Sequence, residues 1–309
     1  MQNAQQFQIQ KTAIVGMGAL GLLYGNHIRN HCGLDAVEFV MDQDRKEKYS
    51  GQDFVINGET KQFRLTAAKE AEPADLLIVA VKYTGLMAAL DVMKNCIDEN
   101  TIIISVLNGI SSEEIIGERY GKENIIYTVA QGMDAMKFGN SLQYTRMGEL
   151  YVGALPKQDC EKLRRLTAFF KEIELPYVEE EDILYRMWSK FMLNAGVNQT
   201  CMVYETTYAG VLAEGEANRT MISAMREVVA LANAEGISLS EKDINQYVDI
   251  LKTLNPDGTP SMGQDRINKK PSEVEMFAGT VMRLAKKHDI YVPVNAFLYD
   301  SVEKIEKTY

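Results

Sequence analysis

Histidine and cysteine are scarce in this sequence, and it lacks a long apolar run. Three histidines are too few for a histidine-rich metal site, and the four cysteines lie far apart, without the close pairs of metal ligands. We therefore expect no bound metal. We expect reduced thiols in a cytoplasmic protein, although the spacing alone leaves a disulfide open. No run of about 18 apolar residues occurs, so no membrane-spanning helix is expected.

Basic residues are also fewer than acidic residues in this sequence. The 309 residues include 33 Lys and Arg against 43 Asp and Glu, which gives a formal net charge of −10. A nucleic-acid partner would need a basic face, so that class of function is not expected. A local basic pocket for an anionic substrate stays compatible with this balance. Residues 1–10 are polar and Gln-rich and contain no apolar signal-peptide core, which again indicates a cytoplasmic protein.

A glycine-rich stretch near the start organises the chain. The apolar run Thr12–Val15 predicts a strand, residues 19–28 predict a helix, and between them begins the sequence Gly16, Met17, Gly18, Ala19, Leu20, Gly21. In such an order, the first glycine permits a turn, the second admits a pyrophosphate close to the backbone, and the third lets helix and strand pack closely. The helix N-terminus then attracts phosphate. The placement favours a dinucleotide site over an ordinary tight turn.

Strands alternate with helices through the first half of the chain, which predicts a parallel sheet with right-handed crossovers. Further strands are expected at residues 36–41, 75–81, 101–107, 125–129 and 177–178, and helices at 84–96, 112–120 and 160–173. Asn57-Gly58 predicts a hairpin between 54–56 and 62–65. Residues 141–145 and 150–152 look antiparallel.

The second half is predicted to be helical, because composition changes at the acidic run 179–182. Helices are expected at residues 183–200, 216–235, from 240 onward, 272–288 and from 293 to near the end, with loops at 255–260 and 261–265. Ser240 with Asp243, and Ser272 with Glu275, have the spacing of capping boxes. We therefore predict an α/β protein: a Rossmann-type dinucleotide-binding domain over residues 1–180, then an all-helical domain over residues 181–309.

Three polar residues share one face of the helix expected from residue 183. Lys190, Asn194 and Asn198 are spaced i, i+4, i+8 among apolar residues. They could form a solvated stripe on the surface. Alternatively, they could line a polar pocket in which the lysine donates a proton or holds a carboxylate while the amides orient a substrate.

Polar residues also follow two expected strands. Lys82 and Asn108 come at the ends of neighbouring apolar runs, where parallel sheets bind ligands. Either residue alone is compatible with ordinary turn chemistry, but together, beside the glycine turn, they favour a cofactor or substrate role. Glu273 falls in the first turn of an expected helix, where an acid also stabilises the helix dipole.

Over nearly its whole length, the sequence resembles the ketopantoate reductase (2-dehydropantoate 2-reductase) family. The resemblance rests on the order and spacing of six motifs: Gly16-x-Gly18-Ala19-Leu20-Gly21, Val81-Lys82, Asn108-Gly109, Lys190-x3-Asn194-x3-Asn198, Ser261-Met262-x-Gln264-Asp265 and Glu273-x-Glu275-x3-Gly279. It implies a Rossmann domain followed by a helical domain, with the active site in the cleft between them. It also implies NADP(H)-dependent reduction of ketopantoate to pantoate in pantothenate biosynthesis.

The resemblance further implies a role for each matching residue. Lys190 would be the general acid that protonates the developing alkoxide, and Glu273 would support catalysis and hold the substrate hydroxyl. The substrate-binding positions would be Asn108, Asn194, Asn198 and Ser261. The glycine turn and Lys82 would contact the cofactor, and Asn108 would line both sites.

Asp42 departs from the family pattern. It replaces the basic residue that usually grips the 2′-phosphate of NADPH, and an acid about 20 residues after the glycine turn favours the ribose hydroxyls of NAD. Arg45, Lys46 and Lys48 follow closely and could restore phosphate binding, so both NADP(H) and NAD(H) stay open. The sequence departs from the family in two further places. The glutamine that the family has after the Lys82 strand is missing, with Gly85 near its place, and residues 129–134 lack the usual threonine-rich pattern, which leaves the exact substrate open.

Two alternatives follow from these departures. The chain could reduce a different 2-keto acid, or it could be a non-catalytic dinucleotide-binding sensor. The presence of Lys190, Asn194, Asn198, Ser261 and Glu273 together speaks against a sensor, which needs no acid aimed at a ketone. The expected partner is a small keto acid, and a homodimer is left open.

Overall fold

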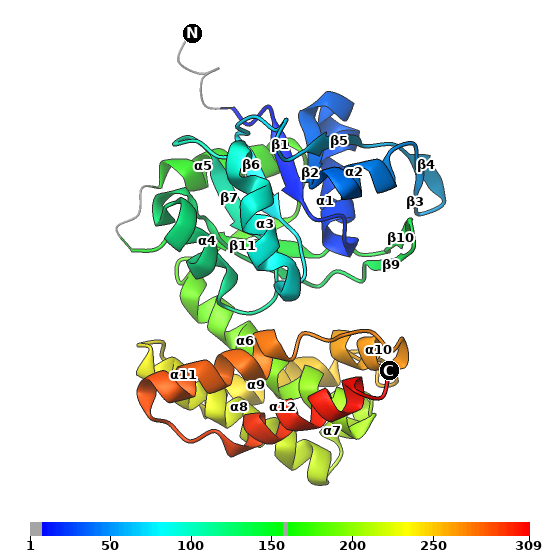
Figure 1. Ribbon diagram of the computed structural model, residues 1–309. Helices are drawn as coiled ribbons and strands as arrows, with labels where there is room; N and C mark the ends of the chain where they lie inside the picture. The colour runs from blue at the N-terminus through cyan, green and yellow to red at the C-terminus, as the bar shows by residue number, and fades with distance from the viewer. Residues whose placement is uncertain (1–7, 157–159) are drawn as a thin grey trace. The chain divides into compact units, whose positions relative to one another are not determined.

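The structure, a computed structural model, describes residues 8–156 and 160–309, which form two compact units (Figure 1). The first unit contains the chain up to Asn108 together with Ser112–Ile183. The second contains Gly109–Ser111 and Leu184–Tyr309. Residues 1–7, which belong to the polar N-terminal stretch considered above, and residues 157–159 lie outside the described part.

A five-stranded parallel sheet lies at the centre of the first unit, in the order β5–β2–β1–β6–β7. The strands are β1 (Thr12–Val15), β2 (Val37–Met41), β5 (Arg64–Ala67), β6 (Leu76–Val79) and β7 (Ile102–Ser105). Every residue of β1, β2, β6 and β7 is buried, which explains why these strands are nearly continuous apolar runs. The predicted parallel sheet is confirmed, and its carboxyl ends lie along one edge.

Five helices accompany these strands in the described part of the first unit: α1 (Ala19–Cys32), α2 (Gln43–Tyr49), α3 (Leu86–Met93), α4 (Ser112–Tyr120) and α5 (Glu161–Glu172). Helix α1 lies so close to β2 that a Cβ on Gly25 would be 2.6 Å from the Phe39 ring. Helix α2 was not predicted. None of its residues is buried, so the sequence carries no apolar periodicity there.

Two smaller sheets complete this unit. One has the order β12–β11–β8, with β8 (Tyr127–Gln131), β11 (Glu149–Gly153) and β12 (Tyr177–Glu179). The other has the order β4–β3–β10–β9, with β3 (Phe54–Ile56), β4 (Glu59–Lys61), β9 (Met136–Phe138) and β10 (Ser141–Gln143). Strands β10 and β11 thus lie in different sheets, and each has an antiparallel partner as predicted, β9 for β10 and β8 for β11.

The predicted Asn57-Gly58 turn is confirmed. Asn57 and Gly58 have φ angles of 48° and 88°, and they connect β3 to β4. The partner strand begins immediately after the turn, at Glu59, and not at Gln62 as predicted. The later segment Arg64–Ala67 instead joins the parallel sheet as β5, because its side chains Thr66 and Ala67 are buried there.

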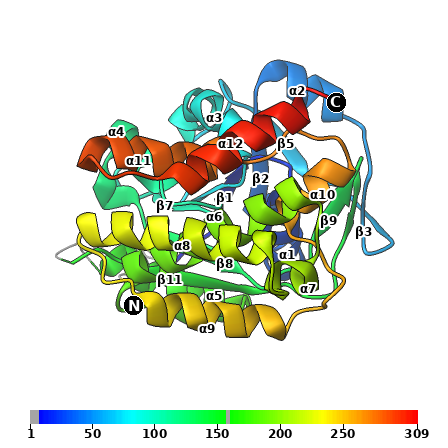
Figure 2. The same cartoon turned by 90° about the horizontal axis from the view of Figure 1, so that it is seen from below.

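The second unit is helical in its described residues, as predicted. Its α-helices are α6 (Ile183–Tyr204), α7 (Tyr208–Leu212), α8 (Glu216–Ala234), α9 (Glu241–Lys252), α10 (Ser261–Ile267), α11 (Thr280–His288) and α12 (Pro293–Glu306). Helix α8 packs against α9, α11 and α12 (Figure 2). It ends before Gly236, whose φ of 84° suits the turn that follows a helix.

The two predicted capping boxes have opposite outcomes. Ser240 and Asp243 form a complete box at the start of α9. The box of Ser272 and Glu275 is wrong, because the Glu275 carboxylate accepts from Tyr299 at 3.0 Å and pairs with Arg283. A π-helix, η6 (Glu275–Gly279), begins where the capped α-helix was expected. Gly279 allows this packing, since a Cβ there would lie 2.7 Å from the Glu275 carboxyl carbon.

The loop predicted at residues 261–265 is also wrong, because these residues form most of α10. A seven-residue helix containing glycine has weak local signals, and contacts with other helices stabilise it, as described below.

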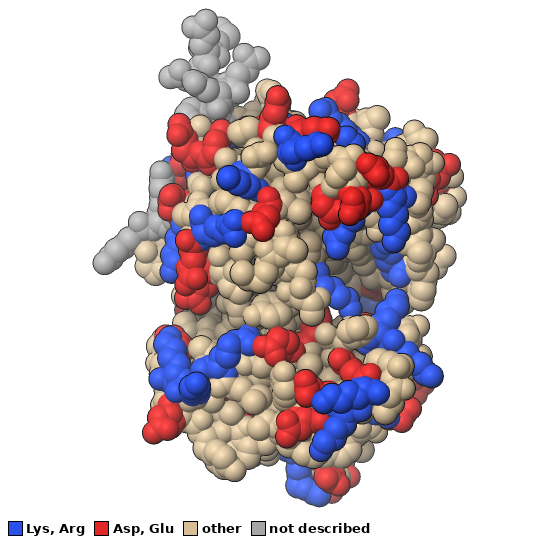
Figure 3. All heavy atoms as spheres, viewed as in Figure 1, with Lys and Arg blue, Asp and Glu red and all other residues tan. Residues whose placement is uncertain are grey.

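The cysteines and the charged side chains are distributed as follows in the described residues. Cys96 and Cys201 are buried, whereas Cys32 and Cys160 are exposed, and no disulfide joins any two of them within the described residues. On the face drawn in Figure 3, acidic and basic side chains alternate over each unit. Within residues 8–156 and 160–309, no helix combines the length and apolarity needed to cross a membrane.

Candidate functional site

The glycine turn after β1 leaves no room for side chains at its first and third glycines. Gly16 has a φ of 112°, and a Cβ on it would lie 2.4 Å from the Ala80 carbonyl oxygen of the neighbouring chain segment. A Cβ on Gly21 would lie 2.0 Å from the Gly16 carbonyl oxygen, so the first turn of α1 packs directly on the loop. The turn and the helix start are therefore fixed by the absence of side chains.

The N-terminus of α1 has the properties of an anion site. Gly18 is the N-cap, no side chain caps the helix, and the first turn contains no acid. The first N–H groups of a helix lack partners within the helix, and the positive end of the helix dipole lies there. A phosphate group would satisfy both features.

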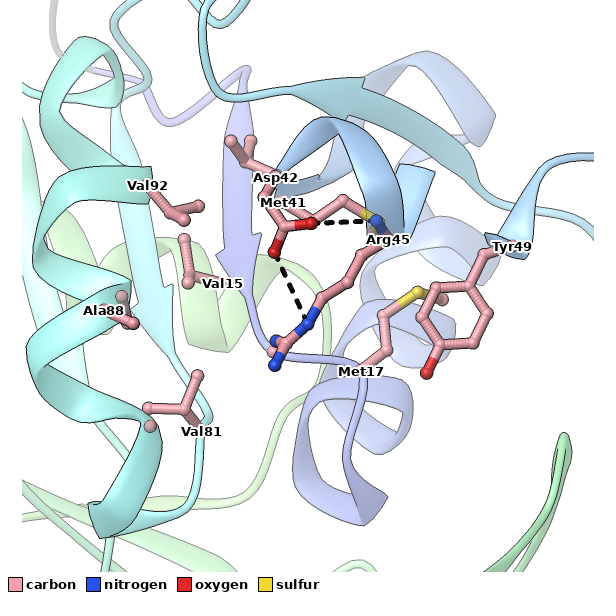
Figure 4. Close-up of a pocket in the computed structure, with 13 residues that line it drawn as sticks. Val15, Met17, Met41, Asp42, Arg45, Tyr49, Val81, Ala88 and Val92 are labelled. Atoms are coloured by element: carbon pink, nitrogen blue, oxygen red, sulfur yellow. Dashed lines mark hydrogen bonds and ion pairs between the residues drawn. The ribbon is translucent and has the colours of Figure 1, made fainter. Parts of the chain in front are cut away.

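A pocket lies beside this turn, between α2 and α3 (Figure 4). Its walls come from three strand ends and two helices, and they consist of Val15, Gly16, Met17, Val40, Met41, Asp42, Arg45, Tyr49, Val81, Gly85, Ala88, Ala89 and Val92. Ala88 and Val92 on α3 lie across from Asp42 and Arg45 in the close-up. An apolar pocket with one carboxylate and one guanidinium suits a flat ring attached to a polar group.

Asp42 has two roles at this pocket. It is the N-cap of α2, and its Oδ1 accepts the Arg45 backbone N–H at 2.8 Å. Its Oδ2 lies 3.4 Å from Arg45 Nε, with both side chains largely exposed. Lys46 instead pairs with Glu70 at 2.6 Å, so of the three basic residues considered above, Arg45 is the one that lines the pocket.

Sequence reasoning missed Tyr49, which also lines this pocket. Asp42, Arg45 and Tyr49 are spaced i, i+3, i+7 and so share a face of α2. That spacing could have revealed them together, had a helix been predicted after Asp42.

Lys82 and Asn108 lie at the same edge of the sheet as the glycine turn. Strands β6 and β7 are paired neighbours, with Val79 opposite Ser105, and each polar residue comes three positions after its strand ends. Lys82 is exposed and precedes a short 3₁₀ turn, whereas Asn108 is half-buried. The first unit therefore collects the glycine turn, Asp42, Lys82 and Asn108 along one edge.

The three polar residues of α6 are not a solvated stripe. Asn194 and Asn198 are only 8% and 7% exposed, and Lys190 is half-buried. Asn198 donates from Nδ2 to Ser261 Oγ at 3.3 Å, which brings the first residue of α10 to the polar face of α6. Lys190, Asn194 and Asn198 on α6 and Ser261 on α10 thus lie on two adjoining helices.

Arg266 fastens α10 to the end of α6, and sequence reasoning did not select it. Its guanidinium donates to the carbonyl oxygens of Met202 and Val203, the latter at 3.1 Å, and pairs with Glu205 at 2.8 Å. The last carbonyl groups of a helix lack partners in the helix, so an arginine there is a natural cap.

Glu273 lies in the turn before the π-helix and not in the first turn of an α-helix. It is half-buried, and its carbonyl oxygen accepts from the N–H groups of Met276 and Phe277 at 3.0 and 3.1 Å. Glu273 therefore belongs to a segment whose geometry is set by the π-helix.

Comparison with known proteins identifies relatives over almost the whole chain. The family model described as ketopantoate reductase PanE/ApbA matches residues 12–157, and its C-terminal counterpart matches residues 182–306. The 2-dehydropantoate 2-reductase of Streptococcus pyogenes serotype M3 is 24% identical over 285 residues, covering 91% of this chain and 92% of the relative. That of Aquifex aeolicus is 26% identical over 308 residues, covering 96% and 97%.

Solved structures share the fold. A ternary structure of D-mandelate dehydrogenase with NADH and anilino(oxo)acetate has a TM-score of 0.83 at 23% identity, covering 96% of this chain and 99% of that one. A PanE/ApbA family ketopantoate reductase from Ralstonia eutropha JMP134 has a TM-score of 0.81 at 22% identity, with the same coverage.

Proposed function

Because the chain belongs to the ketopantoate reductase family of oxidoreductases, we propose that it reduces 2-dehydropantoate to pantoate with a hydride from a nicotinamide dinucleotide. The observation that carries this proposal is the second unit's polar face, where Lys190 lies beside two nearly buried asparagines. A buried amide is costly unless it is hydrogen-bonded. Asn198 already donates to Ser261, and a keto acid would supply polar atoms for the remaining donors and acceptors of this face.

The proposed chemistry assigns one task to each polar group. Hydride addition to a ketone builds negative charge on the carbonyl oxygen, and the ammonium group of Lys190 offsets this charge and delivers the proton. Asn194, Asn198 and Ser261 orient the substrate, and Glu273 holds its hydroxyl group. Asn108 lines the place where cofactor and substrate meet. The proposal requires residues of both units to act on one substrate.

The glycine turn and the pocket of Figure 4 would hold the cofactor. The uncapped start of α1 suits the pyrophosphate, and the apolar walls suit the adenine ring, with Lys82 nearby at the sheet edge. We propose NADH as the preferred form, because the Asp42 carboxylate occupies the start of α2 and neutralises Arg45. A 2′-phosphate would meet the carboxylate there, whereas two ribose hydroxyls could donate to it.

Initial rates with ketopantoate, measured with NADH and NADPH side by side, test this proposal. We expect turnover with both cofactors and a higher kcat/KM with NADH. No turnover with either cofactor would refute the ketopantoate assignment.

Reduction of another 2-oxo acid is the second candidate, because a D-mandelate dehydrogenase shares this fold closely. Residues 129–134, at the end of β8, lack the family's threonine-rich pattern, which also favours a different substrate. A panel of aliphatic and aromatic 2-oxo acids separates the two candidates by their ratio of kcat/KM. Cofactor binding without turnover of any of these acids would instead support the sensor hypothesis.

A further inference from the structure

A register shift separates Glu273 from α11. The Phe277 N–H donates to the carbonyl of Glu273, four residues back, whereas the Gly279 N–H donates to that of Val274, five residues back, at 3.1 Å. Ala278, which lies between them, donates its N–H to the side chain of Gln199 at 3.1 Å. A π-helical insertion of this kind leaves one backbone N–H without an acceptor in its own helix, and Gln199 provides the acceptor.

Gln199 is built into the core of the second unit. It is fully buried on α6, where its Nε2 donates to the Ala195 carbonyl at 2.7 Å and to Asn295 Oδ1 at 3.3 Å. Its Oε1 is thereby directed at Ala278. Both ends of the amide are satisfied, so the orientation of Gln199 is specified by its partners.

Asn295 and Glu227 extend this arrangement to two further helices. Asn295 is fully buried on α12 and donates from Nδ2 to the Ala224 carbonyl at 3.2 Å and to Glu227 Oε2 at 2.8 Å, both on α8. The Glu227 carboxylate also accepts from the backbone of Val294 and Asn295 at the start of α12, at 2.7 and 2.9 Å. Gln199 is therefore anchored to α8 and α12 as well as to its own helix.

The register shift decides where Glu273 points. Inserting one residue rotates the preceding turn by about 100° around the helix axis relative to α11. Gln199 directly follows Asn198, so the helix that carries the proposed substrate-binding residues also fixes this register. We propose that Gln199 is a positioning residue that holds the π-helix and thereby places Glu273. This inference rests on the proposed function, in which Glu273 holds the substrate hydroxyl.

The test compares three variants. Gln199→Met has the same length but no hydrogen-bond donor and only a weakly accepting sulfur, so Ala278 loses its amide partner. Gln199→Glu should carry a neutral carboxyl, because burial disfavours its charged form, and that group can still accept from Ala278 and donate to Asn295. Thr200→Val is the matched control: Thr200 is the next residue, is equally buried, and its hydroxyl has no hydrogen-bond partner among the described residues.

We expect Gln199→Met to lower kcat/KM for the keto acid by at least about tenfold, since small misplacements of a positioned group cost this much or more. The Kd for NADH should stay within about twofold, because the glycine turn is distant in the chain and unaltered. Hydrogen exchange in the peptide spanning residues 274–280 should accelerate. Gln199→Glu should recover most of the lost activity, and Thr200→Val should match the unaltered protein.

Equal losses in Gln199→Met and Thr200→Val, or unchanged exchange in Gln199→Met, would overturn the positioning role. An unaltered protein that reduces none of the keto acids, with exchange still accelerated in Gln199→Met, would refute the proposed function and support the hold of Gln199 on the π-helix. Should Gln199→Met fail to fold, Gln199→Asn takes its place, because its amide is one methylene too short to reach Ala278.

Discussion

Asp42 combines two functions that can be separated by substitution. Its carboxylate caps α2 and also neutralises Arg45 at the pocket. Serine is an equally good N-cap but carries no charge. Asp42→Ser should therefore keep α2 intact, release the Arg45 guanidinium for a 2′-phosphate, and raise the NADPH-to-NADH ratio of kcat/KM by about tenfold, or about 1.4 kcal/mol.

Steady-state kinetics with both cofactors check this expectation. Asp44→Ser is the matched control, because Asp44 lies in the first turn of the same helix and does not line the pocket. The assignment of Asp42 fails if both variants leave the cofactor ratio unchanged.

Lys190 should be needed for proton transfer and not for cofactor binding. Lys190→Ala should lower kcat by about 10²–10⁴-fold, which is the usual contribution of a general acid. Lys190→Arg should be nearly as impaired, because arginine keeps the charge but does not release its proton. Titration with NADH should give the same Kd for all three proteins. If the protein is a non-catalytic sensor, neither Lys190 substitution should change any property that these assays measure.

At the residue scale, the sequence predicts side chains best where backbone geometry leaves no choice. Gly16 and Gly21 could be assigned because only glycine fits so close to Ala80 and to the turn itself. Tyr49 could not be assigned, because its role depends on a solvated helix that has no apolar pattern. The roles of Lys190 and Glu273 stay predictions that only kinetics can test.

At the scale of elements, α10 depends on a contact that is distant in sequence. Arg266→Met should remove the cap on the end of α6 and lower the free energy of unfolding by about 1.5–3 kcal/mol, as expected for hydrogen bonds to a charged group. Because α10 begins at Ser261, we also expect a higher KM for the keto acid. Urea unfolding and steady-state kinetics measure the two effects.

Lys270→Met is the control for Arg266→Met, since Lys270 is exposed just beyond α10. A KM that does not change in Arg266→Met, despite lower stability, would show that Ser261 is held by other contacts.

Elements were predictable where their signals are local. The capping box of Ser240 and Asp243 and the Asn57-Gly58 turn involve residues within one turn of each other. The π-helix was not predictable, because Ala278 is held by Gln199, which lies 79 positions away in the chain. The Glu275 carboxylate was misassigned for the same reason, since its partner Tyr299 lies on another helix.

At the scale of the whole molecule, the two buried cysteines report on the integrity of each unit. Burial raises the pKa of both Cys96, in the first unit, and Cys201, in the second, to about 12. The thiolate is the reactive form, so both should resist a thiol reagent at pH 8. The exposed Cys160 should react, and Cys32, whose pKa is also raised by partial burial and by Glu172, should react more slowly.

Ellman's reagent followed by peptide mass spectrometry identifies the labelled positions. Cys96 and Cys201 should become labelled only in denaturant. If one of them reacts at a lower denaturant concentration than the other, the two units unfold separately. Rapid labelling of both in buffer would contradict the burial described above.

The order of strands and helices in the first half and the helical second half could be predicted from the sequence, because apolar runs and helical spacing are local signals and the composition changes at the acidic run 179–182. The division in space is less simple, since Gly109–Ser111 belong to the second unit. A segment of only three residues is too short to change the local composition, so the sequence could not reveal that it belongs to the second unit.

The solvated character of α2 has a consequence for how this protein can change. Since none of its residues is buried, substitutions along α2 alter the unfolding free energy by no more than about 0.5 kcal/mol at most positions. Yet one face of α2 supplies Asp42, Arg45 and Tyr49 to the pocket. Tyr49 packs against the core, but the side chains of Asp42 and Arg45 are largely exposed. Preference for one dinucleotide over another can therefore drift in a descendant sequence through exchanges at these two positions, with no compensating change in the core.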